Sequence, residues 1–573
     1  MTSIKASKYD LKACLLSVFF GTLLPLSMAP FHWWPLGLIS IAGLSFLICD
    51  SPTTKDHFKT LFFRTFSYGM GVFALGASWI FVSIHEHGGA SIGLALFLIT
   101  PFIVFLALLL ATPFILLGKA LKISENISPS KPLLYLCMTM LLVFPSLWVI
   151  GEWFRGWAFS GFPWLYLGYA HTDTWLSGWA TITGVLGVSW IVAFCGALLG
   201  LYIRLGLFVR LGLSIRLPGL YVGPTQETRF KEIKTSHKTI VLSGGLSLTL
   251  LFWLGGAYFQ TINWTMPTGK PLSIGLVQPA LPLSIKWDPR QLPSIVERYR
   301  TDTEKLLEND LIIWPESAIP RFYHEVTGYL DTIVSELNDT HTALITGIPT
   351  AENNADQNNS AQDNKSNGTD NNNDGSNNFF SSYYNSVVGL GQASGTYHKQ
   401  HLVPFGEYVP FEKWLRGTIA FFDLPMSAFN SGPANQQPIT AKGAIIGTAI
   451  CYEIAYSELV RKSASNANLL LTLSNDTWFG KSIGPKQHFQ IARMRAIENG
   501  KPLIRATNDG ISALITADGK VRATIPSYKH DILEGTLEPR KGLTPFGQYG
   551  SLPILLVSFF CTLIALLRKS VWV

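Results

Sequence analysis

The sequence predicts a two-part protein, in which an α-helical membrane bundle of eight spans carries a water-soluble α/β domain. Three observations support this fold class. The composition is 48% hydrophobic and only 14% charged, whereas an average soluble domain has about 25% charged residues. Eight apolar runs lie outside residues 260–550. Within that segment, short β-rich apolar runs alternate with helical stretches, a pattern typical of an α/β domain.

The eight apolar runs account for the predicted spans. A helix needs about 20 apolar residues to cross the hydrocarbon core of a bilayer. Several runs contain proline, which a membrane helix tolerates as a kink where its neighbours cover the freed backbone groups. The second and eighth runs are short. In chain order, the runs lie at 11–30, 33–49, 62–84, 92–118, 133–153, 180–203, 239–259 and 552–567.

Basic residues in alternate loops predict the orientation of the bundle. Lysines and arginines precede the first span, lie in every second loop and follow the eighth span. The other loops before residue 260 share one basic residue, Arg155. Because positive loops stay in the cytoplasm, both termini are predicted to be cytoplasmic. The predicted domains are a seven-span transmembrane domain at 1–259, an extracytoplasmic domain at 260–550, and an eighth span with the cytoplasmic C-terminus at 551–573.

The first apolar run has an alternative interpretation as a cleaved signal peptide. It begins with basic residues, and Ser27-Met28-Ala29 resembles a small-residue cleavage site. Pro30 directly after these residues disfavours cleavage, so we interpret the run as a span.

Residues 260–550 contain the predicted α/β domain. Helices are expected at Leu292–Glu308 and at Pro485–Asn499, the second with proline near its start and glycine just past its end. Residues 352–378 are mostly Asn, Asp, Ser and Gly, which bury too little apolar surface to offset the entropy of ordering. We predict a disordered insertion there. The predicted strands are Ser273–Val277, Leu311–Trp314, Ala343–Ile348, Asn385–Leu390, Ala444–Ile450, Leu469–Leu473, Leu503–Ala506 and Ser512–Thr516.

Charge and cysteine usage exclude several classes of protein. The net charge of +7 is spread over several short loops, which argues against a nucleic-acid partner. Five of the six cysteines fall in predicted spans, so Cys451 has no partner for a disulfide within the soluble domain. His85-Glu86-His87 does not match the zinc-binding pattern His-Glu-x-x-His. We predict no metal site and no cofactor.

Three reactive side chains follow predicted strands. Glu316 ends the stretch 311–316, Lys399 lies in the stretch 397–407, and Cys451 directly follows the strand 444–450. Functional groups of α/β sheets gather at the carboxyl ends of strands. A thiol has a pKa of about 8.5 and needs a base or a positive neighbour to become a thiolate. Glu316 can accept the thiol proton, and Lys399 can stabilise an oxyanion. Taken singly, each residue has a simpler interpretation, as a buried structural thiol, a strand-end carboxylate or a surface lysine.

Taken together, these motifs resemble a known family. Trp314-Pro-Glu316, Lys399 and Cys451-Tyr-Glu453, in that order, resemble the Glu–Lys–Cys triad of the nitrilase, or carbon–nitrogen hydrolase, superfamily. The fuller strings resemble the apolipoprotein N-acyltransferase family, which also has eight spans and a nitrilase-like domain between the seventh and eighth. Those strings are Trp-Pro-Glu-Ser-Ala-Ile-Pro (314–320), Leu-Val-Pro-Phe-Gly-Glu-Tyr-Val-Pro (402–410), Ser-Asn-Asp-Thr-Trp-Phe-Gly (474–480), Gly-Pro-Lys-Gln-His-Phe-Gln (484–490) and Gly-Phe-Pro-Trp (161–164).

The resemblance implies a nitrilase-like α-β-β-α sandwich and a ping-pong acyl transfer without a cofactor. Glu316 would deprotonate Cys451, whose thiolate would attack an ester of a membrane phospholipid while Lys399 stabilises the oxyanion. The resulting thioester would be attacked by the α-amine of a diacylated lipoprotein. The resemblance also implies roles for five supporting or substrate-binding residues: Trp287, Glu407, Tyr452, Glu453 and Trp478.

The resemblance further implies the location of the protein. We expect a multi-pass protein of the bacterial cytoplasmic (inner) membrane, with its catalytic domain in the periplasm. A monomer is expected, since nothing in the sequence demands an oligomer. The stretch Tyr408–Phe429 is unusually apolar, and we expect it to be an arm that lies on the membrane or gates lipid access. The alternative for that stretch is a core segment.

Two other functions are weighed against acyl transfer. A membrane-anchored amidase or nitrilase acting on a small carbon–nitrogen substrate would also need the triad, but a single span would anchor it. A transporter or flippase would be expected to carry ionisable residues inside its spans, whereas these spans have almost none.

Overall fold

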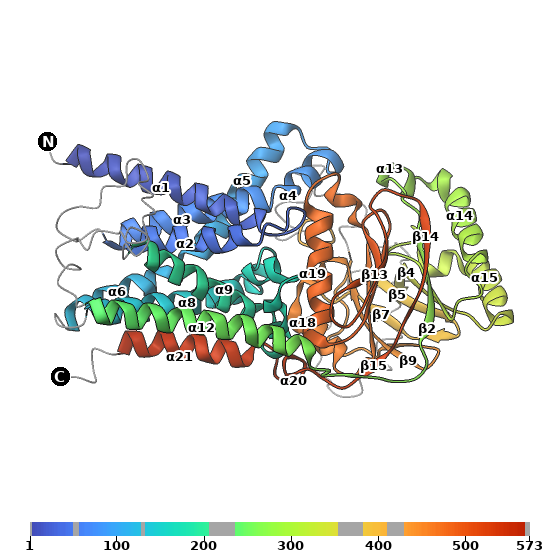
Figure 1. Ribbon diagram of the computed structural model, residues 1–573. Coiled ribbons are helices and arrows are strands. Elements are labelled where there is room, and N and C mark those ends of the chain that lie inside the picture. The colour runs from blue at the N-terminus through green and yellow to red at the C-terminus, as the bar shows by residue number, and fades with distance from the viewer. Residues whose placement is uncertain are drawn as a thin grey trace, which may run out of the picture.

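The computed structural model describes residues 3–49, 57–127, 132–204, 235–352, 382–408 and 429–567. One half is a bundle of helices that run side by side, and the other half contains two β-sheets (Figure 1). Helices α18 (Ser457–Ala464) and α19 (Gly484–Asn499) lie between the sheets and the bundle. The start of α1 (Ser3–Leu26) and the end of α21 (Leu552–Leu567) lie at the same end of the bundle, away from the sheets.

The bundle helices follow the predicted apolar runs. In the described part of the chain, three helices are long and apolar enough to cross a membrane, and a fourth results if one pair bent by 50° is taken as a single span. Three further apolar helices are shorter. The other bundle elements are α2 (Pro35–Cys49), α3 (His57–Gly76), α4 (Trp79–Val82), η1 (Ser83–His87), α5 (Ile92–Ala111), α6 (Phe114–Ile127), α7 (Pro132–Met138), η2 (Thr139–Val143), α8 (Phe144–Arg155), α9 (Ala180–Arg204) and α12 (Thr235–Thr261).

Helix lengths alone therefore do not reproduce eight spans, although each predicted run falls on a helix. The predicted span 62–84 is bent, because α3 ends at Gly76 and the chain turns before α4 continues. Close packing ties the first helix into the bundle: a Cβ added to Gly21 of α1 would lie 2.2 Å from the carbonyl oxygen of Tyr68 in α3. This contact makes α1 an integral part of the bundle.

The first sheet has six strands in the order β14-β2-β3-β4-β5-β7. Its centre, β2 to β4, is parallel and buried, so it needs a helix layer on its outer face. Helices α14 (Leu292–Glu304) and α15 (Thr327–Asp339) supply that layer. The strands are β2 (Leu272–Gln278), β3 (Leu311–Ile313), β4 (Ala343–Glu352), β5 (Ser382–Gly391), β7 (Thr396–His398) and β14 (Asp531–Leu537).

The second sheet has seven strands in the order β13-β12-β11-β10-β9-β8-β6, with a parallel centre formed by β9, β10 and β11. Helices α18 and α19 cover its outer face. The strands are β6 (Ala393–Ser394), β8 (Ile439–Ala441), β9 (Ala444–Ile450), β10 (Leu469–Ser474), β11 (Leu503–Thr507), β12 (Ser512–Ile515) and β13 (Val521–Ile525). A separate two-stranded pair joins β1 (Met266–Pro267) and β15 (Arg540–Lys541).

Apolar side chains from both sheets meet in a common core. The layers are thus helix, sheet, sheet and helix, and the predicted α-β-β-α sandwich is confirmed. All eight predicted strands are found, and α19 ends at Gly500, which has the left-handed φ of +60° expected of a helix cap. Among the strands that were not predicted, β13 and β14 have half-exposed side chains that interrupt the apolar pattern.

Two predicted segments fall largely outside the described residues. The Asn-rich insertion predicted at 352–378 is one, and only its first residue belongs to β4. The apolar arm predicted at Tyr408–Phe429 is the other, and only its two end residues are described.

Candidate active site

Cys451 lies where β9 ends and a short 3₁₀ turn, η9 (Cys451–Ala455), begins. Its φ is +52°, a left-handed conformation that side chains other than glycine rarely adopt. The carbonyl oxygen of Cys451 accepts a hydrogen bond of 3.1 Å from Nε2 of His488 in α19. Burial, together with the nearby charge of Glu316, raises the pKa of the Cys451 thiol well above its usual range. The resting side chain is therefore a thiol, and it needs a base to react.

Glu316 lies just beyond β3, at the carboxyl end of the parallel strands of the first sheet. Its Oε1 accepts a hydrogen bond of 2.8 Å from Nδ2 of Asn385, and its Oε2 accepts one of 2.7 Å from the backbone N–H of Asn475. The Lys399 ammonium lies 3.8 Å from Oε1. Asn385 inside β5 and Asn475 directly after β10 thus hold this carboxylate in place from both sheets.

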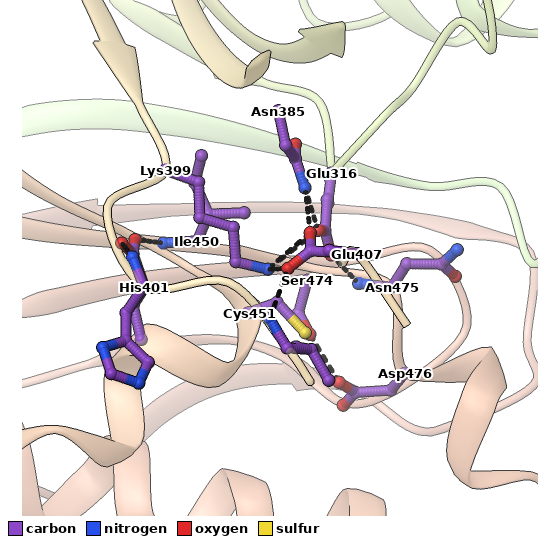
Figure 2. Close-up of polar contacts among 12 residues, drawn as sticks. Glu316, Asn385, Lys399, His401, Glu407, Ile450, Cys451, Ser474, Asn475 and Asp476 are labelled. Atoms are coloured by element: carbon purple, nitrogen blue, oxygen red, sulfur yellow. Dashed lines mark hydrogen bonds and ion pairs between the residues drawn. The ribbon is translucent and has the colours of Figure 1, made fainter. Parts of the chain in front are cut away.

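Lys399 follows β7 and reaches between two carboxylates (Figure 2). Its Nζ lies 2.9 Å from Oε1 and 2.8 Å from Oε2 of Glu407. Burial alone would lower the pKa of Lys399, but Glu407 and Glu316 raise it well above its usual range. Lys399 is therefore a fixed positive charge beside Cys451, whose thiolate form it favours.

Glu407 and Asn385 complete this group. Nδ2 of Asn385 donates to both carboxylates, at 2.8 Å to Glu316 and 2.9 Å to Glu407. The second oxygen of Glu407 accepts from the backbone N–H of Val403 at 2.8 Å. We refer to Glu316, Asn385, Lys399 and Glu407 as the Glu–Lys–Glu cluster. Its formal charge is −1, because two carboxylates surround one ammonium.

Glu453 connects the loop of Cys451 to the loop of Lys399. Its carboxylate accepts backbone hydrogen bonds from Ile450 at 2.7 Å, from Gln400 at 2.7 Å and from His401 at 3.0 Å. The Tyr397 hydroxyl donates to both of its oxygens at 3.1 Å. Burial raises the pKa of Glu453 to about 7. Glu453 thus sets the spacing between the two loops.

Tyr452 and Trp478 face the bundle. The Tyr452 ring stacks on Trp164, with centroids 6.1 Å apart, and its hydroxyl donates to the carbonyl of Gly161 at 3.3 Å. The backbone carbonyl of Trp478 accepts a hydrogen bond of 2.7 Å from Ser83. Both residues therefore join the catalytic sheet to the membrane half.

Trp287 is half-buried and caps the short helix α13 (Leu283–Lys286). The preceding Lys286 is fully buried, and its Nζ donates to the backbone carbonyl of Glu316 at 3.0 Å. Burial lowers the pKa of Lys286 to about 8, against the opposing effects of Glu316 and Asp509. Sequence reasoning chose Trp287 and missed Lys286, although a lysine amid apolar residues was the available signal.

A second buried group lies beneath Cys451 and was also missed. Oδ1 of Asp476 lies 2.9 Å from Nδ1 of His488, and its Oδ2 lies 2.7 Å from Nη2 of Arg505. Ser474 donates to Oδ1 of Asp476 at 2.5 Å. We refer to Asp476, His488 and Arg505 as the Asp–His–Arg cluster. The signal for it was a charged residue, Arg505, inside the predicted apolar strand Leu503–Ala506.

Fold and site together define a class of protein: a membrane-bound enzyme with a carbon–nitrogen hydrolase domain and a cysteine nucleophile. A family model described as the apolipoprotein N-acyltransferase N-terminal domain matches residues 20–198. A second model, carbon–nitrogen hydrolase, matches residues 274–541. The two matches correspond to the bundle and to the sandwich.

Curated relatives narrow the class to one family. The apolipoprotein N-acyltransferases of Pseudomonas paraeruginosa and Pseudomonas aeruginosa PAO1 are both 38% identical to this chain, over 94% and 97% of its length and 93% and 96% of theirs. That of Vibrio cholerae is 34% identical over 95% of this chain and 94% of its own. The chain therefore belongs to the apolipoprotein N-acyltransferase family. Among solved structures, Saccharomyces cerevisiae Nit3 of the nitrilase superfamily is 16% identical, covers 47% of this chain and 91% of its own, and has a TM-score of 0.33.

Proposed function

We propose that this enzyme transfers an acyl chain from a membrane phospholipid to the N-terminal α-amine of a diacylated lipoprotein, through a thioester on Cys451. The observation that carries this proposal is the Glu–Lys–Glu cluster beside Cys451, with Lys399 within 3.8 Å of both glutamates. The names of the relatives supply the class of reaction.

In the first half-reaction, Glu316 takes the proton of the Cys451 thiol, and the sulfur attacks an ester carbonyl carbon of the phospholipid. Lys399 stabilises the negative oxygen that develops on that carbon. The C–O bond of the ester breaks, and the leaving glycerol oxygen takes the proton from Glu316. A lysophospholipid departs, and the acyl chain remains on Cys451 as a thioester.

In the second half-reaction, the free α-amine of the lipoprotein attacks the thioester carbonyl. Glu316 takes a proton from the nitrogen, the C–S bond breaks, and the sulfur leaves as a thiolate stabilised by Lys399. The proton then returns from Glu316 to the sulfur. The products are an N-acylated lipoprotein and the free Cys451 thiol.

The supporting residues have separate roles in this proposal. Glu407 holds Lys399, and Glu453 fixes the loops of Lys399 and Cys451 relative to each other. Tyr452 and Trp478 keep the catalytic sheet in register with the membrane half. We assign Trp287 to the rim of the site, because it adjoins the lysine that binds the backbone of Glu316.

We also propose the predicted topology, with eight spans, cytoplasmic termini and a periplasmic catalytic domain in the bacterial inner membrane. The boundaries are those predicted, at 1–259, 260–550 and 551–573, and a monomer is the proposed state. Two observations support the topology. Each predicted run falls on a helix, and the start of α1 and the end of α21 lie at the same end of the bundle, away from the sheets (Figure 1).

The acyl-enzyme is the direct test. Detergent-purified protein is incubated with phosphatidylethanolamine, and its intact mass is measured. We expect a gain of one acyl chain that hydroxylamine removes and that Cys451→Ala abolishes. Cys561→Ala is the matched control, because its thiol lies in α21, and it should acquire the same adduct as the wild type. A folded wild-type protein that gains no acyl mass would refute the proposal.

A further inference from the structure

A turn of the membrane half, residues 159–161, contacts the loops that carry Lys399, Glu407 and Cys451. Three consecutive residues of this turn have left-handed backbone conformations, with φ values of +54° at Phe159, +75° at Ser160 and +79° at Gly161. Side chains other than glycine rarely adopt such conformations, and these persist only where the surroundings enforce them. Such strained segments cluster at functional sites.

The surroundings of the turn enforce its shape. The Phe162 N–H donates to the carbonyl of Arg155 at 2.7 Å, and Nη1 of Arg155 donates back to the carbonyl of Phe162 at 2.7 Å. A Cβ on Gly161 would lie 2.2 Å from the carbonyl oxygen of Gly156, so only glycine fits. The turn is therefore a rigid extension of α8.

The carbonyls of the turn accept hydrogen bonds from the catalytic domain. Nε2 of His401, two residues after Lys399, donates to the Ser160 carbonyl at 2.8 Å. The Tyr456 hydroxyl, on the loop that follows Cys451, lies 2.8 Å from the Ser160 carbonyl and 3.1 Å from that of Gly161.

The Ser160 side chain reaches the loop of Glu407. Its hydroxyl shares a hydrogen bond of 2.7 Å with the hydroxyl of Tyr408, the neighbour of Glu407. Through these bonds the turn fixes the positions of the Lys399, Cys451 and Glu407 loops relative to the bundle.

The same turn presents an aromatic ring outward. The Phe159 side chain is 79% exposed and touches Phe105 of α5 edge to face, with ring centroids 5.3 Å apart. An exposed phenylalanine next to apolar membrane helices fits a lipid chain better than water. Phe159 is thus one residue away from the carbonyl that holds the catalytic loops.

We propose that Phe159 is a contact for the acyl chains of the phospholipid donor, held by the 159–161 turn at a fixed position relative to Cys451. This inference rests on the proposed function. An acyl chain that packs on Phe159 is held by the same backbone that positions Cys451. The ester of that phospholipid is therefore held at a fixed position relative to the thiol. Phe159 acts on the donor, whereas Tyr456 acts as a positioning residue through the turn.

The test compares the rates at which two different acyl donors acylate Cys451. Phosphatidylethanolamine in detergent micelles needs a chain contact, whereas p-nitrophenyl acetate acylates Cys451 with release of p-nitrophenolate and carries no long chain. The rate of mass gain on Cys451 is measured with each donor for the wild type, Phe159→Ser, Phe159→Leu and Trp157→Ser. Trp157 is the matched control, because it is 53% exposed but its ring packs on Trp153 and Phe154 of α8.

We expect Phe159→Ser to slow acylation by the phospholipid about tenfold, as loss of one phenylalanine contact implies, and to change acylation by p-nitrophenyl acetate less than twofold. Phe159→Leu should restore most of the phospholipid rate, and Trp157→Ser should match the wild type with both donors. Tyr456→Phe should slow both donors alike, about fivefold.

Three outcomes would overturn the inference: a wild-type rate for Phe159→Ser, an equal loss with both donors, or an equal loss for Trp157→Ser. Failure of the wild type to gain acyl mass from either donor would instead refute the proposed function itself.

Discussion

Two buried charged clusters lie on either side of Cys451, and they differ in charge balance. The Glu–Lys–Glu cluster has two carboxylates around one ammonium, whereas the Asp–His–Arg cluster pairs one carboxylate with one guanidinium. The side chains of Glu316 and Glu407 keep 8% and 9% exposure, whereas Asp476, His488 and Arg505 have none.

This difference in charge balance indicates different roles for the two clusters, one in the reaction and one in stabilising the fold. In the Asp–His–Arg cluster, His488 and Arg505 overcome the effect of burial and hold the pKa of Asp476 well below its usual range. The Asp476 carboxylate therefore stays ionised and paired with His488 and Arg505. The Glu–Lys–Glu cluster has one carboxylate more than its cation balances, and it contains Glu316, the base that we propose for the Cys451 thiol. We expect the Asp–His–Arg cluster to control stability and the Glu–Lys–Glu cluster to control the rate of acylation.

Among the variants that test this difference, Lys399→Met should have the largest effect. The variant removes the charge that we propose stabilises the oxyanion, so we expect acyl-enzyme formation on Cys451 to fall about 1,000-fold. The rate is followed by intact mass, and thermal unfolding of the same samples confirms that the protein is folded. Lys305→Met is the control, since Lys305 is 55% exposed and pairs with Asp302. A rate within tenfold of wild type would remove Lys399 from the mechanism.

Asp476→Asn tests the other cluster. It leaves the Arg505 guanidinium buried without a counter-charge, so we expect a loss of about 3 kcal/mol in the free energy of unfolding. Asp518→Asn breaks the exposed Lys520–Asp518 pair and should cost less than about 1 kcal/mol. Denaturant unfolding measures both. Equal losses for the two variants would show that the Asp–His–Arg cluster is not a structural support.

Lys286 predicts a pH dependence of stability. Its folded-state pKa of about 8 lies below the unfolded value of about 10.4. Between those pH values the unfolded chain holds a proton that the folded chain has released, so this lysine makes stability rise with pH. We expect a contribution of about 1.4 kcal/mol per pH unit across that window, which Lys286→Met should remove. Thermal unfolding at pH 8, 9 and 10 compares the two proteins, and identical slopes would contradict the assignment.

Tyr397→Phe should have the smallest effect. It removes one donor from Glu453 and leaves the three backbone donors in place. We expect a loss of about 1 kcal/mol in stability and less than a threefold change in acylation rate. If acylation of Cys451 stopped in this variant, Glu453 would be part of the chemistry and not only a link between loops.

Local pattern was enough to predict much of the sandwich and the core of the site. The apolar runs ending at Trp314 and Ile450 predicted two strand ends, and the rule that functional groups gather there brought Glu316 and Cys451 together. Strands β13 and β14 could not be predicted in this way, because their exposed residues break the run.

Contacts between distant parts of the chain were beyond local pattern. Asn385 bridges two carboxylates from separate loops, and nothing in its neighbours indicates which residues it faces. The strained turn at Phe159 depends equally on Arg155, Gly156 and the catalytic loops that close around it. The bend between α3 and α4 was also beyond local pattern, because the apolar run 62–84 is continuous in composition.

The second half-reaction tests the account most directly. Enzyme acylated on Cys451 is separated from phospholipid and mixed with a synthetic peptide that begins with S-diacylglyceryl-cysteine, either with a free α-amine or with that amine acetylated. We expect the free amine to remove the acyl mass from Cys451 and to gain it as an amide, while the acetylated peptide leaves the acyl-enzyme intact. Loss of the acyl chain to water at the same rate with both peptides, without an acylated product, would contradict acyl transfer through Cys451.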